Sequence, residues 1–199
     1  MKKQPELFNE NYWSSRYKRN DSGWDMGEVS SPLKEYFDQM TNKNISILIP
    51  GCGNAYEADY LLQKGFKNIT LIDISPQPVD KLKKKFAAFL NKEIIIICGD
   101  FFTLNQNFDL IVEQTFFCAI DPSLRINYVD KMNRLLKVNG KLIGVLFNRV
   151  FEGGPPFSGS KAEYHLLFKD KFEIKIMDEC YNSIRQRKGS ELFVMLQKL

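Results

Sequence analysis

The segment ISILIPGCGNA, residues 45–55, decides which fold the sequence predicts. Residues 45–50 form a strand-sized apolar run, Gly51 and Gly53 follow it, and a helical pattern covers residues 55–64. Glycines at this point let the backbone turn sharply and approach a ligand closely, and the N-terminus of the next helix offers free amide donors. A purely structural turn has the same glycine pattern, so the segment by itself predicts a βα unit and leaves ligand binding open.

Downstream of this unit, short β-branched runs alternate with helical patterns, which is typical of a parallel sheet. Strands are predicted at residues 45–50, 69–73, 94–98, 108–113, 141–147, 172–180 and 191–197, and helices at 55–64, 78–90, 122–136 and 160–169. The helix over 122–136 is expected to stop before Asn139-Gly140, and the last two strands can pair as a hairpin. The sequence therefore predicts an α/β fold with a seven-stranded, mostly parallel sheet, an antiparallel last strand and helices on both faces.

The length of 199 residues suits one domain, with 44% apolar and 26% charged residues as in globular proteins. We expect a single domain over 1–199, in which a helical lid segment at 1–44 covers a Rossmann-like core at 45–199. The longest apolar runs, such as 94–98, are far shorter than the roughly 20 residues of a membrane span. The N-terminus carries charge without the apolar stretch of a secretory signal, so we expect a cytoplasmic protein.

The cysteines lie far apart, with no C-x-x-C pair and only His165 as an imidazole, so no metal site is predicted. We expect Cys52, Cys98, Cys118 and Cys180 to act as small buried hydrophobes. The net charge of +4 is spread along the chain. Its basic runs, at 81–85 and 185–188, are expected to be a solvated helix face and an exposed loop. The sequence thus indicates neither a nucleic-acid nor a membrane partner, and we expect a monomer.

Asp73 closes the second predicted strand, 22 residues after Gly51. A carboxylate at this place can accept hydrogen bonds from both ribose hydroxyls of an adenosine ligand, although it can also simply cap the next turn through Ser75. Tyr56 stands where the loop of a dinucleotide-binding protein has its third glycine. This bulky residue argues against a nicotinamide-dependent reductase, so the pattern favours a nucleoside ligand of another kind.

Two further strand ends carry polar or aromatic residues. Asp100 and Phe101 follow the third strand, where an acid and a ring can bind the amino group and the face of an adenine. Gln114 follows the fourth strand, at the carboxyl edge where open α/β sheets bind ligands. Four strand ends should therefore meet at one rim, and together they are more specific than any one of them.

The N-terminal segment contributes the aromatic residues Trp13, Tyr17 and Trp24, the first two at helical spacing. They can simply pack in the core. However, S-adenosylmethionine carries a sulfonium, and an aromatic face near such a cation stabilises it by roughly 0.5 to 2 kcal/mol. We therefore interpret these residues as an aromatic lid over that cofactor.

With these motifs in place, the chain resembles the thiopurine S-methyltransferase family, and within it the plant-type halide and thiocyanate (thiol) methyltransferases. The residues that carry the resemblance are Trp13-x-x-x-Tyr17, Gly23-Trp24-Asp25-x-Gly27, Ile49-Pro50-Gly51-Cys52-Gly53, Leu71-Ile72-Asp73-Ile74-Ser75, Phe108-Asp109-Leu110-Ile111, Phe116-Phe117-Cys118-Ala119-Ile120-Asp121-Pro122 and Gly153-Gly154-Pro155-Pro156-Phe157. The resemblance implies a class I methyltransferase fold that uses S-adenosylmethionine and releases S-adenosylhomocysteine. It implies cofactor contacts from Trp13, Tyr17, Trp24, Gly51, Gly53, Asp73, Asp100, Phe101 and Gln114.

Two positions depart from the family pattern. Tyr17 replaces a tryptophan of the plant enzymes, and Gln114 replaces their tyrosine and the arginine of the animal thiopurine enzymes. We expect an acceptor pocket between the N-terminal segment and the loop at 153–157, and Gln114 is expected to help choose the acceptor. The candidate pocket residues are Gln114, Phe116, Phe117, Arg149 and Phe157.

The predicted reaction is methyl transfer to a small acceptor, namely a thiol, hydrosulfide, thiocyanate or halide. Such nucleophiles need little or no deprotonation, and no catalytic base is identified, because His165 is expected to lie away from the rim. Glu113 and Asp121 leave a carboxylate base possible. The alternatives are an O-, N- or metalloid-directed methyltransferase on the same fold and a non-catalytic protein that binds S-adenosylmethionine.

Overall fold

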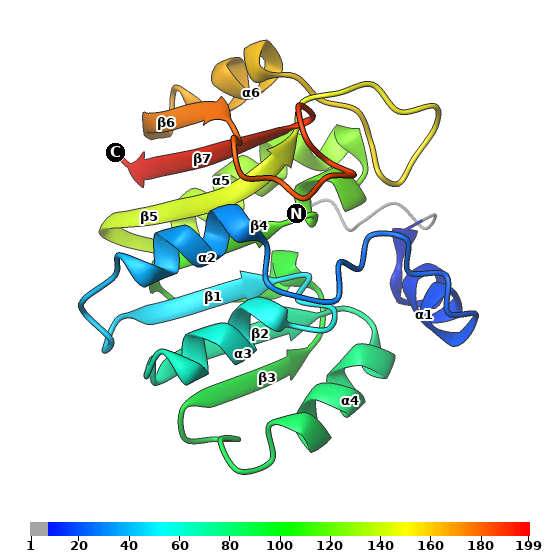
Figure 1. The fold of residues 1–199 in the computed structure, drawn as a ribbon, viewed down its shortest axis with the longest axis vertical. Coiled ribbons are helices and arrows are strands. Elements are labelled where there is room, and N and C mark those ends of the chain that lie inside the picture. The colour runs from blue at the N-terminus through cyan, green and yellow to red at the C-terminus, as the bar shows by residue number, and fades with distance from the viewer. Residues whose placement is uncertain (1–7) are drawn as a thin grey trace.

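A seven-stranded sheet runs through the molecule in the order β3-β2-β1-β4-β5-β7-β6 (Figure 1). The computed structural model describes residues 8–199, so residues 1–7 of the expected lid segment lie outside the described residues. The strands are β1 Ser46–Pro50, β2 Asn68–Asp73, β3 Ile94–Cys98, β4 Phe108–Gln114, β5 Leu136–Phe147, β6 Phe172–Glu179 and β7 Glu191–Lys198. Strands β1 to β5 pair in parallel, and β7 lies antiparallel between β5 and β6. The predicted fold class is confirmed.

The strand order indicates which edge of the sheet is expected to bind a ligand. The chain runs outward from β1 through β2 to β3 and then returns to β4 on the other side of β1. In open α/β sheets, the crevice beyond the carboxyl ends of the strands at such a reversal is where ligands bind. Strands β1 and β2 are buried almost throughout, because their apolar runs are covered on both faces.

Helices cover the two faces of the sheet in separate layers (Figure 1). One layer consists of α2 Ser31–Asp38, α3 Tyr56–Gln63 and α4 Pro76–Lys85, and the other of α5 Arg125–Leu135 and α6 Lys161–Phe168. Buried side chains such as Phe37 and Leu61 pack in the first layer, and Tyr128 and Phe168 in the second. No helix within residues 8–199 combines the length and the apolar content that crossing a membrane requires.

The first helix, α1 Glu10–Lys18, lies beside α4 at the carboxyl edge of the sheet and not on either face (Figure 1). The hydroxyl oxygens of Ser14 on α1 and Ser75 before α4 are 3.2 Å apart. Asn9 begins the helix by accepting a hydrogen bond from the amide of Tyr12 at 3.1 Å. Helix α1 is therefore placed beside the expected ligand edge, whereas α2, which the predicted lid segment at 1–44 includes, packs on a face of the sheet.

The junction between α5 and β5 differs from the prediction. The helix ends at Leu135 and the strand begins at once, so Asn139 and Gly140 lie inside β5 instead of ending a helix. Asn139 has φ of 62°, and the register between β4 and β5 shifts at Phe108. A side chain at Gly140 would come within 3.1 Å of the Phe108 carbonyl oxygen. The Asn-Gly pair therefore accommodates an irregularity in the strand, a role that the same residue types also suit.

The helix predicted at 78–90 runs from Pro76 to Lys85. Its two prolines, Pro76 and Pro78, fall in the first turn, where the missing N–H has no helical partner to lose. Beyond Lys85 the chain forms turns, and Asn91 adopts φ of 59° before β3 begins. The helix therefore begins two residues earlier and ends five residues earlier than the sequence predicts.

Candidate active site

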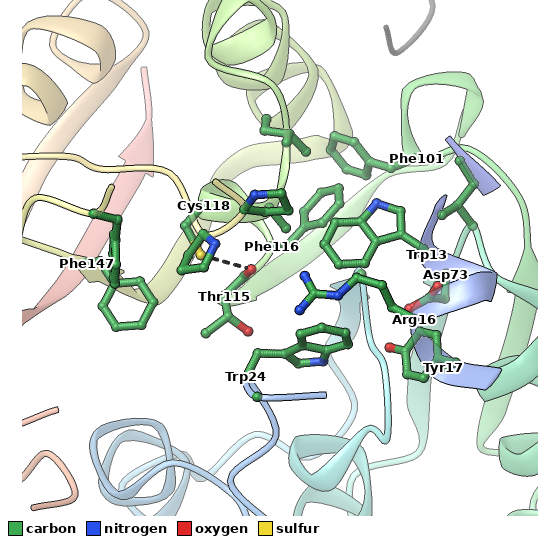
Figure 2. A pocket seen from close by; sticks show the side chains of 18 of the residues that line it. Trp13, Arg16, Tyr17, Trp24, Asp73, Phe101, Thr115, Phe116, Cys118 and Phe147 are labelled. Atoms are coloured by element: carbon green, nitrogen blue, oxygen red, sulfur yellow. Dashed lines mark hydrogen bonds between the residues drawn. The ribbon is translucent and has the colours of Figure 1, made fainter. Parts of the chain in front are cut away.

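A cavity of about 430 Å³ lies beyond the carboxyl ends of the central strands (Figure 2). Three groups of residues line it. The strand ends and the loops after them supply Gly51, Asp73, Asp100, Phe101, Thr115, Phe116 and Cys118; the N-terminal segment supplies Trp13, Arg16, Tyr17 and Trp24; and the C-terminal half supplies Phe147, Arg149, Phe151, Pro155, Pro156, Gln186 and Arg187. The cavity therefore sits where the strand order predicts a ligand.

The backbone of the glycine loop beside the cavity has a conformation that requires glycine at two positions. Gly51 has φ of 57°, and a Cβ there would lie 2.4 Å from the ring of Phe116. Gly53 has φ of 50°, and its amide donates a hydrogen bond to Oδ2 of Asp73 at 3.0 Å. Left-handed backbone and a close neighbour both require glycine, so the loop is built for close approach.

Asp73 is almost fully buried at the end of β2 and accepts two backbone hydrogen bonds. Besides the bond from Gly53, its Oδ1 accepts from the amide of Ser75 at 2.9 Å, so the capping role that the sequence left open is present. Burial raises the pKa of Asp73, and the amides of Ser75, Gly53 and Ile74 oppose that rise. Each carboxylate oxygen has two lone pairs, so the amide bonds leave acceptor capacity toward the cavity.

Asp100 and Phe101 lie together at the end of β3, as predicted. Oδ1 of Asp100 accepts from the amide of Phe102 at 2.9 Å, which begins a single turn of 3-10 helix at Phe101–Thr103. The ring of Phe101 meets that of Phe116 edge-on, with centroids 5.2 Å apart. Both predicted residues line the cavity beside Asp73.

The N-terminal aromatic residues gather around Trp24. Its ring meets those of Trp13 and Tyr17 edge-on, with centroid distances of 5.5 and 5.7 Å. The guanidinium of Arg16, which is ion-paired with Asp21 at 3.0 Å, lies 4.6 Å from the centre of the Trp24 ring. Figure 2 shows Arg16 between Trp13 and Trp24. Sequence reasoning missed Arg16, although its spacing of three residues from Trp13 places both on one helix face.

The turn after β4 is held by the buried carboxylate of Glu113. Its Oε1 accepts from the amides of Phe116 and Phe117 at 2.7 and 2.9 Å, and its Oε2 accepts from the Tyr128 hydroxyl at 2.5 Å. Burial raises the pKa of Glu113 to about 7, and these hydrogen bonds oppose the rise. Thr115, in the same turn, has φ of 57°. Glu113 thus shapes the cavity wall from behind, and its carboxylate does not line the cavity.

The other candidate bases also lie away from the cavity lining. Asp121 accepts from the amide of Ser123 at 2.8 Å and caps a short 3-10 turn. His165 is exposed on α6. Cys118 lines the cavity and its thiol donates to the Thr115 carbonyl oxygen (Figure 2), and burial raises its pKa. Among the residues that the structure describes, the lining therefore holds Asp73 and Asp100 as its only carboxylates and no histidine.

Two of the predicted pocket walls lie elsewhere. Phe117 is buried in the core against Tyr128 and Tyr164, and Phe157 packs edge-on against Phe8 with centroids 5.4 Å apart. Phe116 does line the main cavity, because the turn after β4 directs its side chain toward the cavity and that of Phe117 into the core. Two adjacent phenylalanines in the sequence do not indicate which of them faces the cavity and which faces the core.

Gln114 borders a second, smaller cavity of about 60 Å³, not the main one. This small cavity lies between residues 24–28 and the glycine loop, and it shares Trp24, Gly51 and Thr115 with the main cavity. Both amide atoms of Gln114 are buried and have no hydrogen-bond partner in residues 8–199. Gln114 thus lies beside the glycine loop and outside the lining of the main cavity, whereas the sequence predicts for it both a cofactor contact and a place in the acceptor pocket.

Arg187 corrects another expectation, since the basic run at 185–188 was predicted to be an exposed loop. Its guanidinium is largely buried, donates to the Trp24 carbonyl oxygen at 2.8 Å and pairs with Glu191 at 3.3 Å. Arg187 lines the main cavity together with Arg149, which the sequence did single out. No periodicity marks Arg187, because the long loop before β7 brings it there.

Three comparisons relate this site to known proteins. Residues 8–196 match the model of the thiopurine S-methyltransferase (TPMT) family. The chain is 32% identical over 185 residues to a probable thiol methyltransferase 2 of Arabidopsis thaliana, covering 90% of this chain and 81% of that one. It is 28% identical over 192 residues to thiocyanate methyltransferase 1 of Brassica oleracea, covering 94% and 84%.

Among solved structures, the fold is similar to that of a Burkholderia thailandensis 1,6-didemethyltoxoflavin-N1-methyltransferase with bound S-adenosylhomocysteine. The TM-score is 0.75 at 15% identity, and the match covers 95% of this chain and 86% of that one. At this identity the likeness supports the fold alone.

Proposed function

The chain belongs to the thiopurine S-methyltransferase family and is an S-adenosylmethionine-dependent methyltransferase, and from this premise we propose that its acceptor is a small sulfur nucleophile. The observation that carries the proposal is the contrast between two sides of the main cavity. Asp73 ends β2 and Asp100 follows β3, whereas Arg149 and Arg187 lie in the loops after β5 and before β7. We assign the acidic side to the cofactor and the basic side to the acceptor.

On the acidic side, the residues present fit S-adenosylmethionine. Asp73 would accept the ribose hydroxyls with its remaining lone pairs, and Asp100 and Phe101 would bind the adenine. Gly51 lets the loop pack against the ring of Phe116 at the cavity wall, since any Cβ there would collide with that ring. When bound, S-adenosylmethionine supplies an electrophilic methyl group on a sulfonium and leaves as S-adenosylhomocysteine. Trp13, Tyr17 and Trp24 line the cavity and would face the sulfonium, as well as exclude water.

Gln114 belongs with the cofactor in this arrangement. Its unpartnered amide borders the small cavity next to the glycine loop, and both cavities share Gly51 and Trp24. A cofactor lying on the glycine loop would bring polar groups to that amide and satisfy it.

On the basic side, the lining has arginine, aromatic and proline side chains, and no carboxylate or histidine among the described residues. An alcohol has a high pKa and normally needs a positioned base, whereas a thiol with a pKa near 8.5 is already partly thiolate at neutral pH. Nearby guanidinium groups favour the thiolate further. Positioning and exclusion of water would then supply most of the catalysis, which suits thiols, hydrosulfide, thiocyanate or halides.

Methyl transfer to a thiol needs no base on the protein. The thiol loses its proton to solvent, a sulfur lone pair forms the new bond to the methyl carbon, and the electrons of the broken carbon–sulfur bond neutralise the sulfonium. One chain supplies both sides of the cavity, which supports a monomer as the functional unit.

The test is an acceptor screen with methyl-labelled S-adenosylmethionine over hydrosulfide, small thiols, thiocyanate, halides, thiopurines, alcohols and amines. We expect turnover of hydrosulfide, small thiols or thiocyanate to exceed that of thiopurines. Turnover of alcohols or amines without any sulfur acceptor would show that the proposed acceptor class is wrong. Cofactor binding without S-adenosylhomocysteine formation from any acceptor would point to a non-catalytic binding protein.

A further inference from the structure

The three arginines of the main cavity differ in what their guanidinium groups already bind. Arg16 is paired with Asp21, and Arg187 binds the Trp24 carbonyl oxygen and Glu191. Arg149 has no ion pair and no side-chain hydrogen bond within residues 8–199, and its guanidinium lies 4.8 Å from the centre of the Phe151 ring. Its donors therefore remain open at the cavity mouth.

The backbone fixes where Arg149 stands. It lies just after β5, separated from the last strand residue by Asn148, and its carbonyl oxygen accepts from the amide of Gly159 at 3.2 Å, which closes the loop between β5 and α6. Asp73 ends β2, three strands away in the sheet. Three strand spacings of about 4.8 Å separate the two ends by roughly 14 Å. Arg149 is thus remote from the ribose side and on the side assigned to the acceptor.

We propose that Arg149 binds a carboxylate carried by the acceptor, so that the preferred acceptors are thiols with a carboxylate group. This inference rests on the proposed function. A guanidinium offers a rigid fork of donors that matches a carboxylate with two parallel hydrogen bonds, whereas a soft sulfur anion gains less from it. A guanidinium hydrogen-bonded directly to the reacting sulfur would also stabilise the ground state and slow the attack, whereas one at a distance still favours the thiolate. A carboxylate held at the cavity mouth leaves the sulfur free to face the methyl group.

The experiment compares 3-mercaptopropionate with its neutral amide in wild type, Arg149→Gln and Arg185→Gln. Arg185 is an exposed arginine outside the cavity lining, so its variant controls for the loss of one positive charge. In wild type we expect kcat/KM for the acid to exceed that for the amide at least about fivefold, as for a partly exposed charge-assisted pair. In Arg149→Gln, the ratio of kcat/KM for the acid to that for the amide should fall to near one because KM for the acid rises, and the affinity for S-adenosylhomocysteine should not change. In Arg185→Gln, this ratio should stay as in wild type.

A binding measurement separates this inference from the proposed function. In the calorimetric experiment, 3-(methylthio)propionate or its amide is titrated into the complex of the enzyme with S-adenosylhomocysteine. The acid should bind more tightly than the amide only in proteins that keep Arg149. Equal binding and equal turnover of acid and amide in wild type would overturn the inference and leave the sulfur acceptor standing. Preference for the acid that survives Arg149→Gln would overturn it as well. Selective binding of the acid without turnover of either thiol would support the carboxylate site and contradict the proposed sulfur acceptor.

Discussion

The amide of Gly53 donates to Oδ2 of Asp73 across 3.0 Å, which joins the glycine loop after β1 to the acid that ends β2. The same carboxylate accepts from the amide of Ser75 at 2.9 Å. Asp73 therefore holds two loops of the cavity in place before any ligand is bound, and a ribose would add bonds to a group that is already oriented. Such preorganisation lowers the cost of binding.

Replacing Asp73 should affect both cofactor binding and the stability of the two loops that it holds. Asp73→Ala should weaken S-adenosylhomocysteine binding by at least about 10-fold, since even a single charge-assisted hydrogen bond contributes roughly 1.5 to 3 kcal/mol. It should also lower the free energy of unfolding by about 1 to 3 kcal/mol, because the amides of Gly53 and Ser75 lose their acceptor. Calorimetry and thermal unfolding measure the two effects, with Asp80→Asn on the exposed face of α4 as the control. Unchanged cofactor affinity in folded protein would refute the ribose assignment.

Trp24 should act on binding more than on stability. It is half-buried, and it lines both cavities instead of lying in the core. Trp24→Ala should weaken S-adenosylmethionine binding by roughly 0.5 to 2 kcal/mol, whereas removing a core tryptophan would cost roughly 3 to 5 kcal/mol of folding. Trp24→Phe should recover most of the affinity. A collapse of the melting temperature with normal affinity per folded molecule would contradict the lid assignment.

Gln114 should affect cofactor binding more than the choice of acceptor, although the sequence predicts a role in both. Its side chain borders the small cavity, where both amide atoms lack partners. Gln114→Leu should therefore keep or raise the melting temperature, since it removes unsatisfied buried atoms, and should weaken S-adenosylhomocysteine binding about fivefold or more. Gln114→Arg should also weaken S-adenosylhomocysteine binding, and it should lower the melting temperature because it buries an unpaired charge. If either variant changes the preference among thiols while cofactor affinity stays constant, Gln114 belongs to the acceptor after all.

Glu113 should make stability depend on pH in a defined direction. Burial raises the pKa of Glu113 from 4.5 to about 7 in the folded protein. Between these values the folded state keeps a proton that the unfolded chain releases, so this group's contribution falls as pH rises and levels off above about pH 7. At the conversion of 1.36 kcal/mol per pKa unit the change is about 3 kcal/mol.

Glu113→Gln provides the comparison for this pH dependence, since it keeps the shape of the side chain and removes its titration. The difference in unfolding free energy between wild type and Glu113→Gln should change mainly from pH 4.5 to 7, measured by urea unfolding. A difference that stays constant across this range would contradict the raised pKa. Cofactor affinity should change little in the variant, because Glu113 holds the turn at Phe116 and Phe117 from behind the cavity wall.

Local patterns were sufficient to predict the sheet, its antiparallel last strand and the acidic side of the cavity. The apolar runs around residues 47–49 and 69–72 are covered on both faces, and the parallel arrangement brings every carboxyl end to one edge. Gly51, Asp73 and Asp100 are therefore neighbours by topology alone, because each directly follows or ends a strand. A residue at a strand end has its place determined by the strand order.

The acceptor side depends on tertiary structure, because loops and not strand ends build it. The sequence by itself placed Gln114, Phe117 and Phe157 around one pocket, but the turn after β4 sends Phe117 into the core and Gln114 toward the glycine loop. Only the folded chain brings Arg187, from a loop expected to be exposed, against the Trp24 carbonyl oxygen, 163 residues away in sequence. Hydrophobic periodicity records which face of a strand or helix is buried, whereas the direction of a loop side chain depends on long-range contacts that have no local signature.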